Sequence, residues 1–269
     1  MSMRPIDLSL RIRKKALQLC HEKGASHLGG ALSVADVLAV LYGEVANVNP
    51  KNPSDASRDR IFFSKGHACS AMYAVLQELG FYSGVEDKFA QNGSIFTSHV
   101  SHMVPGIELS TGSLGHALPI AAGTALAAKR KGERWKIYTI LSDGELDEGS
   151  NWETILFAPH HALDNLVVIV DFNKIQSFGT VAEVLALEPL AKKFEAFRWR
   201  AIEIDGHDHA AISAALARAA SASDGIPTAI VAHTIKGKGV SFMENKLAWH
   251  YKSPNADEYR AALAELEGV

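Results

Sequence analysis

The sequence predicts an α/β protein: one doubly wound, mainly parallel sheet with helices on both faces. Two observations lead to this fold class. Helical and strand-like patterns alternate along the whole chain, without repeats or low-complexity tracts. The run 166–170 is apolar at every position, as a strand is when helices cover both faces of its sheet. A chain of 269 residues suffices for one large domain, so we expect residues 1–269 to form a single unit.

The individual elements follow from the spacing of apolar residues. Helical spacing predicts helices at 6–22, 33–41, 68–80, 118–130, 209–222 and 256–266. Ser33 is a suitable N-cap for the second of these helices, and Gly80 is a suitable end for the third. Short apolar runs predict strands at 136–141, 166–170, 201–204 and 229–232. An acidic helix is expected after Gly144, and the less regular segment 180–190 is expected to be a loop near the site.

Charge and cysteine content exclude several classes of protein. The formal net charge of −3 and the pI near 6.5 give no basic face for nucleic acid or for an anionic membrane. Cys20 and Cys69 are too few for a disulfide framework or a zinc cluster. The chain opens without the apolar segment of a signal peptide, and no apolar run is expected to approach a membrane span. We therefore expect a cytoplasmic protein that binds neither nucleic acid nor membrane.

Two polar side chains follow neighbouring strand-like runs. Asp143 follows the run 136–141, and Asn173 follows the run 166–170. Because parallel strands end at the same edge of a sheet, where ligands bind, we expect these two residues to lie close together. With a backbone carbonyl, their oxygens form a set that suits Mg²⁺, completed by phosphate and water. Gly144 would let the backbone approach that phosphate, next to the free amides of the following helix.

The same segment has a second interpretation that needs no ligand. Glu145, Asp147 and Glu148 all favour the N-terminus of a helix, because its dipole attracts negative charge. A solvated acidic turn would therefore show the same pattern, and these residues alone leave both interpretations open.

Six segments, in this order, resemble segments of transketolases, a family of thiamine-diphosphate enzymes. They are Ser26-His27, Ser64-Lys65-Gly66-His67-Ala68, Ser110-Thr111-Gly112-Ser113-Leu114-Gly115, the unit from Asp143 to Asn173, Asp205-Gly206-His207-Asp208 and Lys236-Gly237-Lys238-Gly239. The Asp143-Gly144 pair with Asn173 thirty residues after Asp143 is similar to the diphosphate-binding motif of the family. The resemblance covers nearly the whole chain and corresponds to the N-terminal half of a transketolase.

The resemblance implies a cofactor and its ligands. It places thiamine diphosphate on Mg²⁺, or on Ca²⁺ or Mn²⁺ in its place, held by Asp143, Asn173 and the carbonyl of Ile175. Further contacts with the cofactor are implied for these residues: His67, Gly112, Ser113, Leu114, Gly144, Glu148 and His250. Glu148 and Glu153 also match a carboxylate network between subunits. Residues five apart do not lie closely on one helix face, so ordinary surface glutamates are the alternative.

The resemblance also implies catalytic roles for four histidines, which in the family surround the donor ketose and move protons: His27, His67, His99 and His250. His99 stands in Ser98-His99-Val100, where the family usually has Gly-His-Pro, and His102 is the alternative for this role. His116 stands where the family usually has an amide side chain. It either alters contacts near the cofactor or caps the helix 118–130.

Chain length adds a prediction about a partner. A whole transketolase has three domains and more than twice this length, and only its diphosphate-binding domain is recognisable here. We expect the pyrimidine-binding and C-terminal domains on a separate chain, the C-terminal transketolase subunit, in an α2β2 assembly. Together the two chains would transfer a two-carbon ketol unit from a ketose, expected to be phosphorylated, to an aldose acceptor.

Three alternatives remain open from the sequence. The α subunit of a 2-oxo acid dehydrogenase also has a separate partner, but the segments at Ser26-His27, Lys65-Gly66-His67 and Asp205-Gly206-His207-Asp208 argue against it. A deoxyxylulose-phosphate-synthase-like enzyme shares the early motifs but normally carries its partner domain on the same chain. The third alternative is a non-catalytic binding subunit with the same fold. The sugar itself is not fixed by this half of the enzyme, and a sulfonated sugar or a non-sugar acyl donor stays possible.

Overall fold

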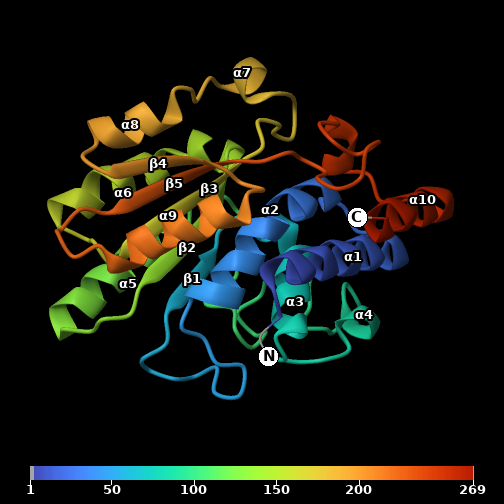
Figure 1. Ribbon diagram of the computed structural model, residues 1–269, viewed down its shortest axis with the longest axis horizontal. Helices are drawn as coiled ribbons and strands as arrows, with labels where there is room; N and C mark the ends of the chain where they lie inside the picture. The colour runs from blue at the N-terminus through green and yellow to red at the C-terminus, as the bar shows by residue number, and fades with distance from the viewer. Residues whose placement is uncertain (1–2, 269) are drawn as a thin grey trace.

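A five-stranded sheet forms the centre of the structure, a computed structural model that describes residues 3–268. The four strand pairings are all parallel, and the order across the sheet is β1-β2-β3-β5-β4 (Figure 1). The strands are β1 (Arg60–Phe63), β2 (Ile137–Ser142), β3 (Leu166–Phe172), β4 (Arg200–Asp205) and β5 (Thr228–His233). The predicted parallel sheet is therefore confirmed.

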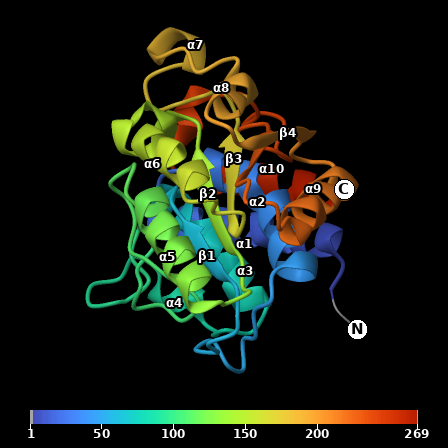
Figure 2. The same cartoon turned by 90° about the vertical axis from the view of Figure 1, so that its left-hand side faces the viewer.

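Helices cover both faces of the sheet, with α5 and α6 on one side and α2 and α9 on the other (Figure 2). One apolar core is shared by α1 (Pro5–Lys23), α2 (Leu28–Val40), α3 (Cys69–Glu78) and α9 (His209–Ser221). The other is shared by α5 (Ala117–Lys131), α6 (Gly149–His160) and α8 (Leu190–Ala196). The last helix packs on α1, and two short helices lie in connections: α10 (Ala256–Glu267), α4 (Val85–Lys88) and α7 (Val181–Val184).

The central strand β3 shows why the sheet needs helices on both sides. Val167 and Ile169 belong to the first core, and Leu166, Val168 and Val170 belong to the second. Successive side chains of a strand point to opposite faces, so a continuous apolar run is buried only when both faces are covered. Every residue of β3 is buried, and the doubly wound architecture is confirmed.

Two elements were not predicted from the sequence. β1 has only four residues and lies at the edge of the sheet, so it is too short for its pattern to be recognised. α8 begins after Pro189, at the end of the segment expected to be a loop. That segment, 180–190, also contains the one-turn helix α7.

Two predicted helix starts are wrong. α2 begins at Leu28, and Ser33 lies inside it, where the hydroxyl donates to the Gly30 carbonyl (3.1 Å) instead of capping the helix. After Asp143 the chain forms a 3₁₀ turn, Gly144–Asp147, and α6 begins only at Gly149. Gly144 is therefore not at the N-terminus of an α-helix.

One apolar stretch has the length of a membrane span but is buried within the protein. Leu28–Val45 comprises α2 and the π-helical turn Leu41–Val45, and its mean hydropathy is 1.5. The expectation that no apolar run approaches a membrane span is therefore wrong. Because α2 packs against α1, α3 and α9, 83% of this window is buried, and its apolar character is that of a core helix.

A buried ion pair joins the elements at the carboxyl edge of the sheet. Lys65, which follows β1, donates to the carboxylate of Asp171 on β3, and both side chains are fully buried. Asp171 also accepts hydrogen bonds from Ser33 of α2 (2.6 Å) and from Thr234, which follows β5. Lys65 donates further to the Gly30 carbonyl of α2 (3.0 Å). Buried charges require such complete pairing, so this network fixes β1, β3, α2 and the segment after β5 relative to one another.

Removing one charge of this pair should destabilise the protein strongly. We expect Lys65→Met to lower the free energy of unfolding by about 3–5 kcal/mol, because the Asp171 carboxylate would stay buried without its partner. Lys192→Met, which removes an exposed ion pair with Glu195, should cost less than about 1 kcal/mol. Urea unfolding measures both values. Equal losses for the two variants would contradict the structural role of the buried pair.

Candidate active site

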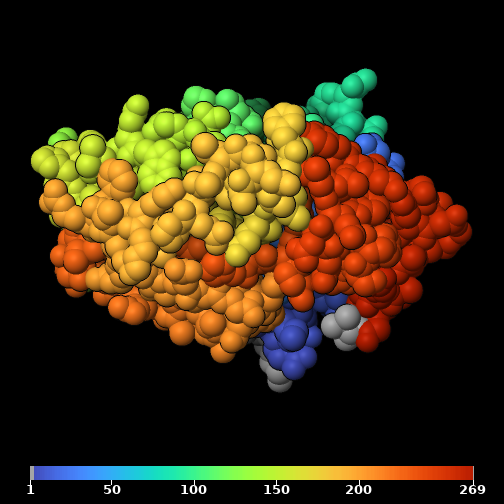
Figure 3. Space-filling model, turned by 90° about the horizontal axis from the view of Figure 1, so that it is seen from above, coloured from blue at the N-terminus to red at the C-terminus, as the bar shows by residue number. Residues whose placement is uncertain are grey.

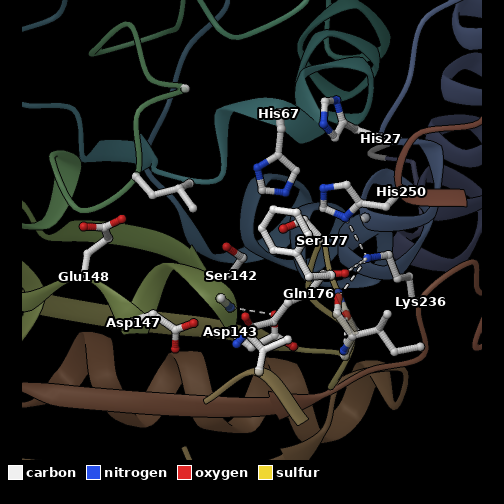
Figure 4. Close-up of a pocket in the computed structure, with 18 of the residues that line it drawn as sticks. His27, His67, Ser142, Asp143, Asp147, Glu148, Gln176, Ser177, Lys236 and His250 are labelled. Carbon is white, nitrogen blue, oxygen red and sulfur yellow. Dashed lines mark hydrogen bonds between the residues drawn. The ribbon is translucent and has the colours of Figure 1, made fainter. Parts of the chain in front are cut away.

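A cavity of about 370 Å³ lies at the carboxyl edge of the sheet (Figure 4). Four strands lead into its lining, with His67 after β1, Asp143 after β2, Asn173 after β3 and Lys236 after β5. Segments far apart in the sequence therefore meet here. In the space-filling view, the loop after β3 (yellow) lies against the segment after β5 (red) (Figure 3).

Asp143 and Asn173 lie at the ends of neighbouring strands, since β2 and β3 pair in parallel along their length. The Asp143 side chain is almost completely buried. Its two carboxylate oxygens accept hydrogen bonds from the amides of Gly144 (2.8 Å) and Lys174 (2.7 Å). The second of these bonds ties Asp143 to the loop that carries Asn173.

The oxygen atoms at this end of the cavity suit a hard cation. The side-chain oxygen of Asn173 lies on the side of the Ile175 amide, 3.2 Å away. Burial, together with the neighbouring Asp171, raises the pKa of Asp143 to about 6, so the carboxylate favours a positive charge beside it. The ammonium of Lys236 donates to the Ile175 carbonyl (2.8 Å), which shows that this carbonyl attracts a cation. One carboxylate, one amide oxygen and one carbonyl fit the metal that the resemblance implies.

The loop 112–115 borders the same cavity. Gly112 and Leu114 line it, whereas Ser113 is exposed and does not, so the structure does not bring Ser113 to the site. Glu145, which is fully buried, holds this loop by accepting a hydrogen bond from the Gly115 amide (2.9 Å). From the sequence, Glu145 was predicted only as an acidic turn residue, because nothing in the pattern shows that it is buried.

Four imidazole rings meet at the other end of the cavity (Figure 4). The centroid of the His27 ring lies 5.0 Å from that of His250, 5.3 Å from that of His67 and 5.7 Å from that of His99. These are the four histidines that the resemblance implies. The alternative residue, His102, is exposed and hydrogen-bonded to Ser110 (2.8 Å), so His99 is the one that lines the cavity.

The backbone of His27 is strained. Its φ of +68° lies in the left-handed region, which residues with a side chain rarely adopt. Its amide donates to the His250 carbonyl (2.9 Å), and its Nδ1 lies 2.9 Å from the hydroxyl of Ser26. Strain of this kind persists where the surroundings over-determine the conformation. Ser26 thus orients the His27 ring, a contact that was not predicted from the sequence.

Burial keeps the four imidazoles neutral. It lowers the pKa of His27 to about 4 and that of His250 to about 3, and the nearby Lys236 ammonium adds to both shifts. Burial also lowers the pKa of His99 and, to well below its usual value, that of His67. A neutral imidazole both donates and accepts a hydrogen bond. The cluster is therefore suited to hold hydroxyl groups and to pass protons between oxygens.

Lys236 is the main residue of the site that was not singled out from the sequence. Its Nζ lies 2.9 Å from His250 Nδ1 and donates to the Ile175 carbonyl, so it connects the imidazole end with the oxygen-rich end. Burial lowers its pKa to about 8. The pattern Lys236-Gly237-Lys238-Gly239 does not distinguish this buried lysine from the partly exposed Lys238. The lining also includes Gly30, Gln176, Ser177, Phe178 and Val184.

Three other predicted residues are not brought together. Glu148 is exposed at the cavity, whereas Glu153 borders a different hollow between α6 and residues 196–198. The structure thus does not place these two glutamates at one site. His116 is exposed, does not line the cavity and makes no side-chain cap to α5, so neither of its expected roles is observed.

The fold and the site define a class of protein: an α/β domain whose carboxyl edge is suited to bind a phosphorylated ligand with a cation. Comparison with protein families makes this more specific. Residues 7–266 match the family described as transketolase, thiamine diphosphate binding domain. The chain therefore belongs to the transketolase family and corresponds to its thiamine-diphosphate-binding domain.

Individual relatives agree with this family. The chain is 39% identical to one named subunit of the apulose-4-phosphate transketolase of Phocaeicola vulgatus, over 94% of this chain and 90% of that protein. It is 41% identical to 6-deoxy-6-sulfo-D-fructose transketolase subunit SqwG of Clostridium sp., over 99% of this chain and 98% of that protein. The transketolase from Leishmania mexicana has a similar structure, with a TM-score of 0.92 and 29% identity over 99% of this chain.

The lengths of these relatives differ in an informative way. This chain spans only 42% of the Leishmania transketolase, but nearly the whole of the two relatives whose names describe them as subunits. The match confirms the predicted family and its thiamine-diphosphate-binding domain. It favours the transketolase interpretation over the 2-oxo acid dehydrogenase and deoxyxylulose-phosphate-synthase alternatives.

The low pKa of His250 predicts a pH-dependent contribution to stability. In the unfolded chain this imidazole takes up a proton near pH 6.5, whereas in the folded chain it resists protonation down to about pH 3. Lowering the pH below about 6.5 therefore favours the unfolded state. We expect His250→Gln to gain stability relative to the parent protein as the pH falls from about 8 to about 5. Urea unfolding over this range measures the difference, and a difference that does not change with pH would contradict the buried, neutral state.

Proposed function

We propose that this chain is the diphosphate-binding subunit of a two-subunit transketolase, which transfers a two-carbon ketol unit from a phosphorylated ketose to an aldose. The observation that carries the proposal is a single cavity with two chemically different ends. Asp143 and Asn173 supply oxygen atoms at one end, and four neutral imidazoles lie at the other. The first end suits a metal-bound diphosphate, and the second suits a substrate with many hydroxyl groups.

The cofactor would be held at the oxygen-rich end. Mg²⁺, or Ca²⁺ or Mn²⁺ in its place, would bind the Asp143 carboxylate, the Asn173 side-chain oxygen and the Ile175 carbonyl. Thiamine diphosphate supplies the electron sink for breaking the carbon–carbon bond beside a ketose carbonyl. Gly112 and Gly144 keep the backbone of their loops free of side chains where it borders the cofactor.

The imidazole cluster would bind the donor and handle its protons. His27, His67, His99 and His250 are neutral, so each ring offers one hydrogen-bond donor and one acceptor to the hydroxyl and carbonyl oxygens of a sugar. Cleavage and formation of the ketol bond require proton transfer at these oxygens, and a positioned imidazole is the usual general acid or base. Glu148, exposed at the cavity, is proposed as a further contact of the cofactor.

The names of the relatives support an anionic sugar as substrate. One name contains a phosphorylated sugar and the other a sulfonated sugar. We infer that the donor here is a ketose with a phosphate group, and that the residues binding this phosphate lie mainly on the partner.

The partner is proposed to be a C-terminal transketolase subunit with the pyrimidine-binding and C-terminal domains, in an α2β2 complex. Both similar bacterial proteins are named as subunits, which supports a second chain. The surface that we propose for it is an apolar patch on α5 and α6, formed by Ile120 (45% exposed), Leu156 (60%) and Phe157 (38%). A hollow of about 610 Å³ lies beside Leu156 and Phe157. Because α6 begins next to Glu148, this surface is continuous with the cavity.

The apolar patch gives a test of the interface. Leu156→Glu should weaken the association with the partner chain by at least about 10-fold, because it would bury an unpaired charge. Ile226→Glu is a matched control, since Ile226 is 39% exposed but lies before β5, at the opposite edge of the sheet. Sedimentation analysis of the mixed subunits measures both affinities. Equal affinities for the two variants would place the partner elsewhere.

Reconstitution tests the proposed function itself. The chain should transfer ketol units from a phosphorylated ketose to an aldose only when its partner chain, thiamine diphosphate and Mg²⁺ are all present. Asp143→Asn should lose Mg²⁺-dependent binding of thiamine diphosphate, measured by calorimetry, and with it the activity of the complex. Asp164→Asn removes the same charge at the opposite edge of the sheet and serves as the control.

The outcomes separate the interpretations that remain. Full activity of the chain without a partner would contradict the two-subunit proposal. A complex that binds the cofactor but transfers no ketol unit from any phosphorylated ketose would support a non-catalytic binding subunit.

A further inference from the structure

The motif Asp205-Gly206-His207-Asp208 lies at the carboxyl end of β4, and none of its four residues lines the cavity. Two of them have local roles. Asp205 accepts a hydrogen bond from the His207 amide (2.8 Å) and thereby closes a turn. Asp208 caps α9 by accepting from the amides of its first turn. The roles of Gly206 and His207 extend beyond this turn.

Gly206 brings the turn against the segment that follows β5. Its amide donates to the His233 carbonyl (2.8 Å). A Cβ at this position would lie 2.4 Å from a side-chain carbon of Thr234, so only glycine permits the approach. Thr234 itself donates to the buried Asp171. The motif therefore contacts the same segment that leads to Lys236.

His207 bridges a carboxylate and a backbone amide, and this fixes the position of its proton. Its Nε2 lies 2.8 Å from the amide nitrogen of Ile235, which can only donate, so Nε2 must be the unprotonated nitrogen. Its Nδ1 lies 2.7 Å from the carboxylate of Asp36 on α2. A carboxylate accepts, so Nδ1 carries the hydrogen. His207 is therefore held as the neutral Nδ1–H tautomer.

The carboxylate that orients His207 is itself firmly held. Asp36 is buried and also interacts with the guanidinium of Arg13 on α1 (3.1 Å for the NH1 bond) and with His209 Nε2 (2.8 Å). Because Arg13 bonds both oxygens of Asp36, this cluster is an ion-pair network and not a metal site. Helices α1, α2 and α9 thus form a rigid base for the His207 ring.

The amide that His207 receives belongs to the residue before Lys236. Lys236 is 2% exposed, and its Nζ contacts the Ile175 carbonyl (2.8 Å) and His250 Nδ1 (2.9 Å). A hydrogen bond at Ile235 fixes the backbone from which this side chain extends. Functional groups must be held within about 0.5 Å of their working positions, and residues behind the site provide that precision.

We propose that His207 is a positioning residue, which sets Lys236 in the cofactor site through the Ile235 amide. The proposal rests on the proposed function, because it assigns Lys236 to the binding of the metal-bound diphosphate. It gives the third residue of the Asp-Gly-His-Asp motif a role at a site that the motif does not touch.

Two substitutions separate this role from a structural one. Glutamine at position 207 extends an acceptor oxygen to the place of Nε2 and keeps the bond to Ile235. Asparagine is shorter and keeps a donor at the place of Nδ1, so it retains only the bond to Asp36. We expect His207→Asn to weaken Mg²⁺-dependent binding of thiamine diphosphate at least about 10-fold, and His207→Gln to restore most of that affinity. His209→Ala, which loses a bond to Asp36 but does not contact Ile235, should bind like the parent protein.

The measurements are calorimetric titration of thiamine diphosphate with Mg²⁺ and, on the chain without cofactor, ¹⁵N NMR of the histidine rings. Equal affinities of His207→Asn and His207→Gln would overturn the proposal, as would an Nε2–H tautomer of His207 in the parent protein. The NMR result does not depend on cofactor binding. A parent protein that shows the Nδ1–H tautomer but binds no thiamine diphosphate would contradict the proposed function, and with it the assignment of Lys236.

Discussion

The ion pair between Lys65 and Asp171 is the interaction on which the arrangement of the site depends. Both groups are fully buried, and a charge in such a place is tolerated only when it is completely paired. Each partner stands two residues before a residue that lines the cavity: Lys65 before His67, and Asp171 before Asn173. Ser33 and Thr234 bring α2 and the segment after β5 to the same carboxylate. The elements that carry the lining residues are thus attached to one another beneath the cavity.

Burial also explains why the two ends of the cavity differ. It raises the pKa of Asp143 and lowers that of Lys236, so each group is more easily charged when a charge of opposite sign lies nearby. The same burial, reinforced by Lys236, keeps His27 and His250 neutral. A metal with a diphosphate would complete the oxygen-rich end, and the neutral rings would remain available for a sugar. The proposed partner would close a cavity of which this chain supplies one side.

The sequence predicts those parts of the site that are determined by strand ends. Asp143 and Asn173 follow long apolar runs, and parallel strands bring such positions together whatever the details of packing. The convergence of His27 and His250 comes instead from loops, whose paths no periodic pattern encodes, and it was predicted only through the family resemblance. β1 was missed because four residues are too few for a pattern, and Ser33 looks like a cap although it bonds inside α2. The roles of Lys236 and His207 depend on burial and on contacts between distant segments, which a single sequence does not display.

The central claim is that Asp143, Asn173 and the Ile175 carbonyl hold the metal of a bound diphosphate. The most direct test is a crystal structure with Mn²⁺ and thiamine diphosphate, in which anomalous scattering locates the metal. We predict one strong peak within coordination distance, about 2.1–2.3 Å, of these three oxygen atoms and of the diphosphate. A peak elsewhere, or a bound diphosphate with no metal at these oxygens, would contradict the account.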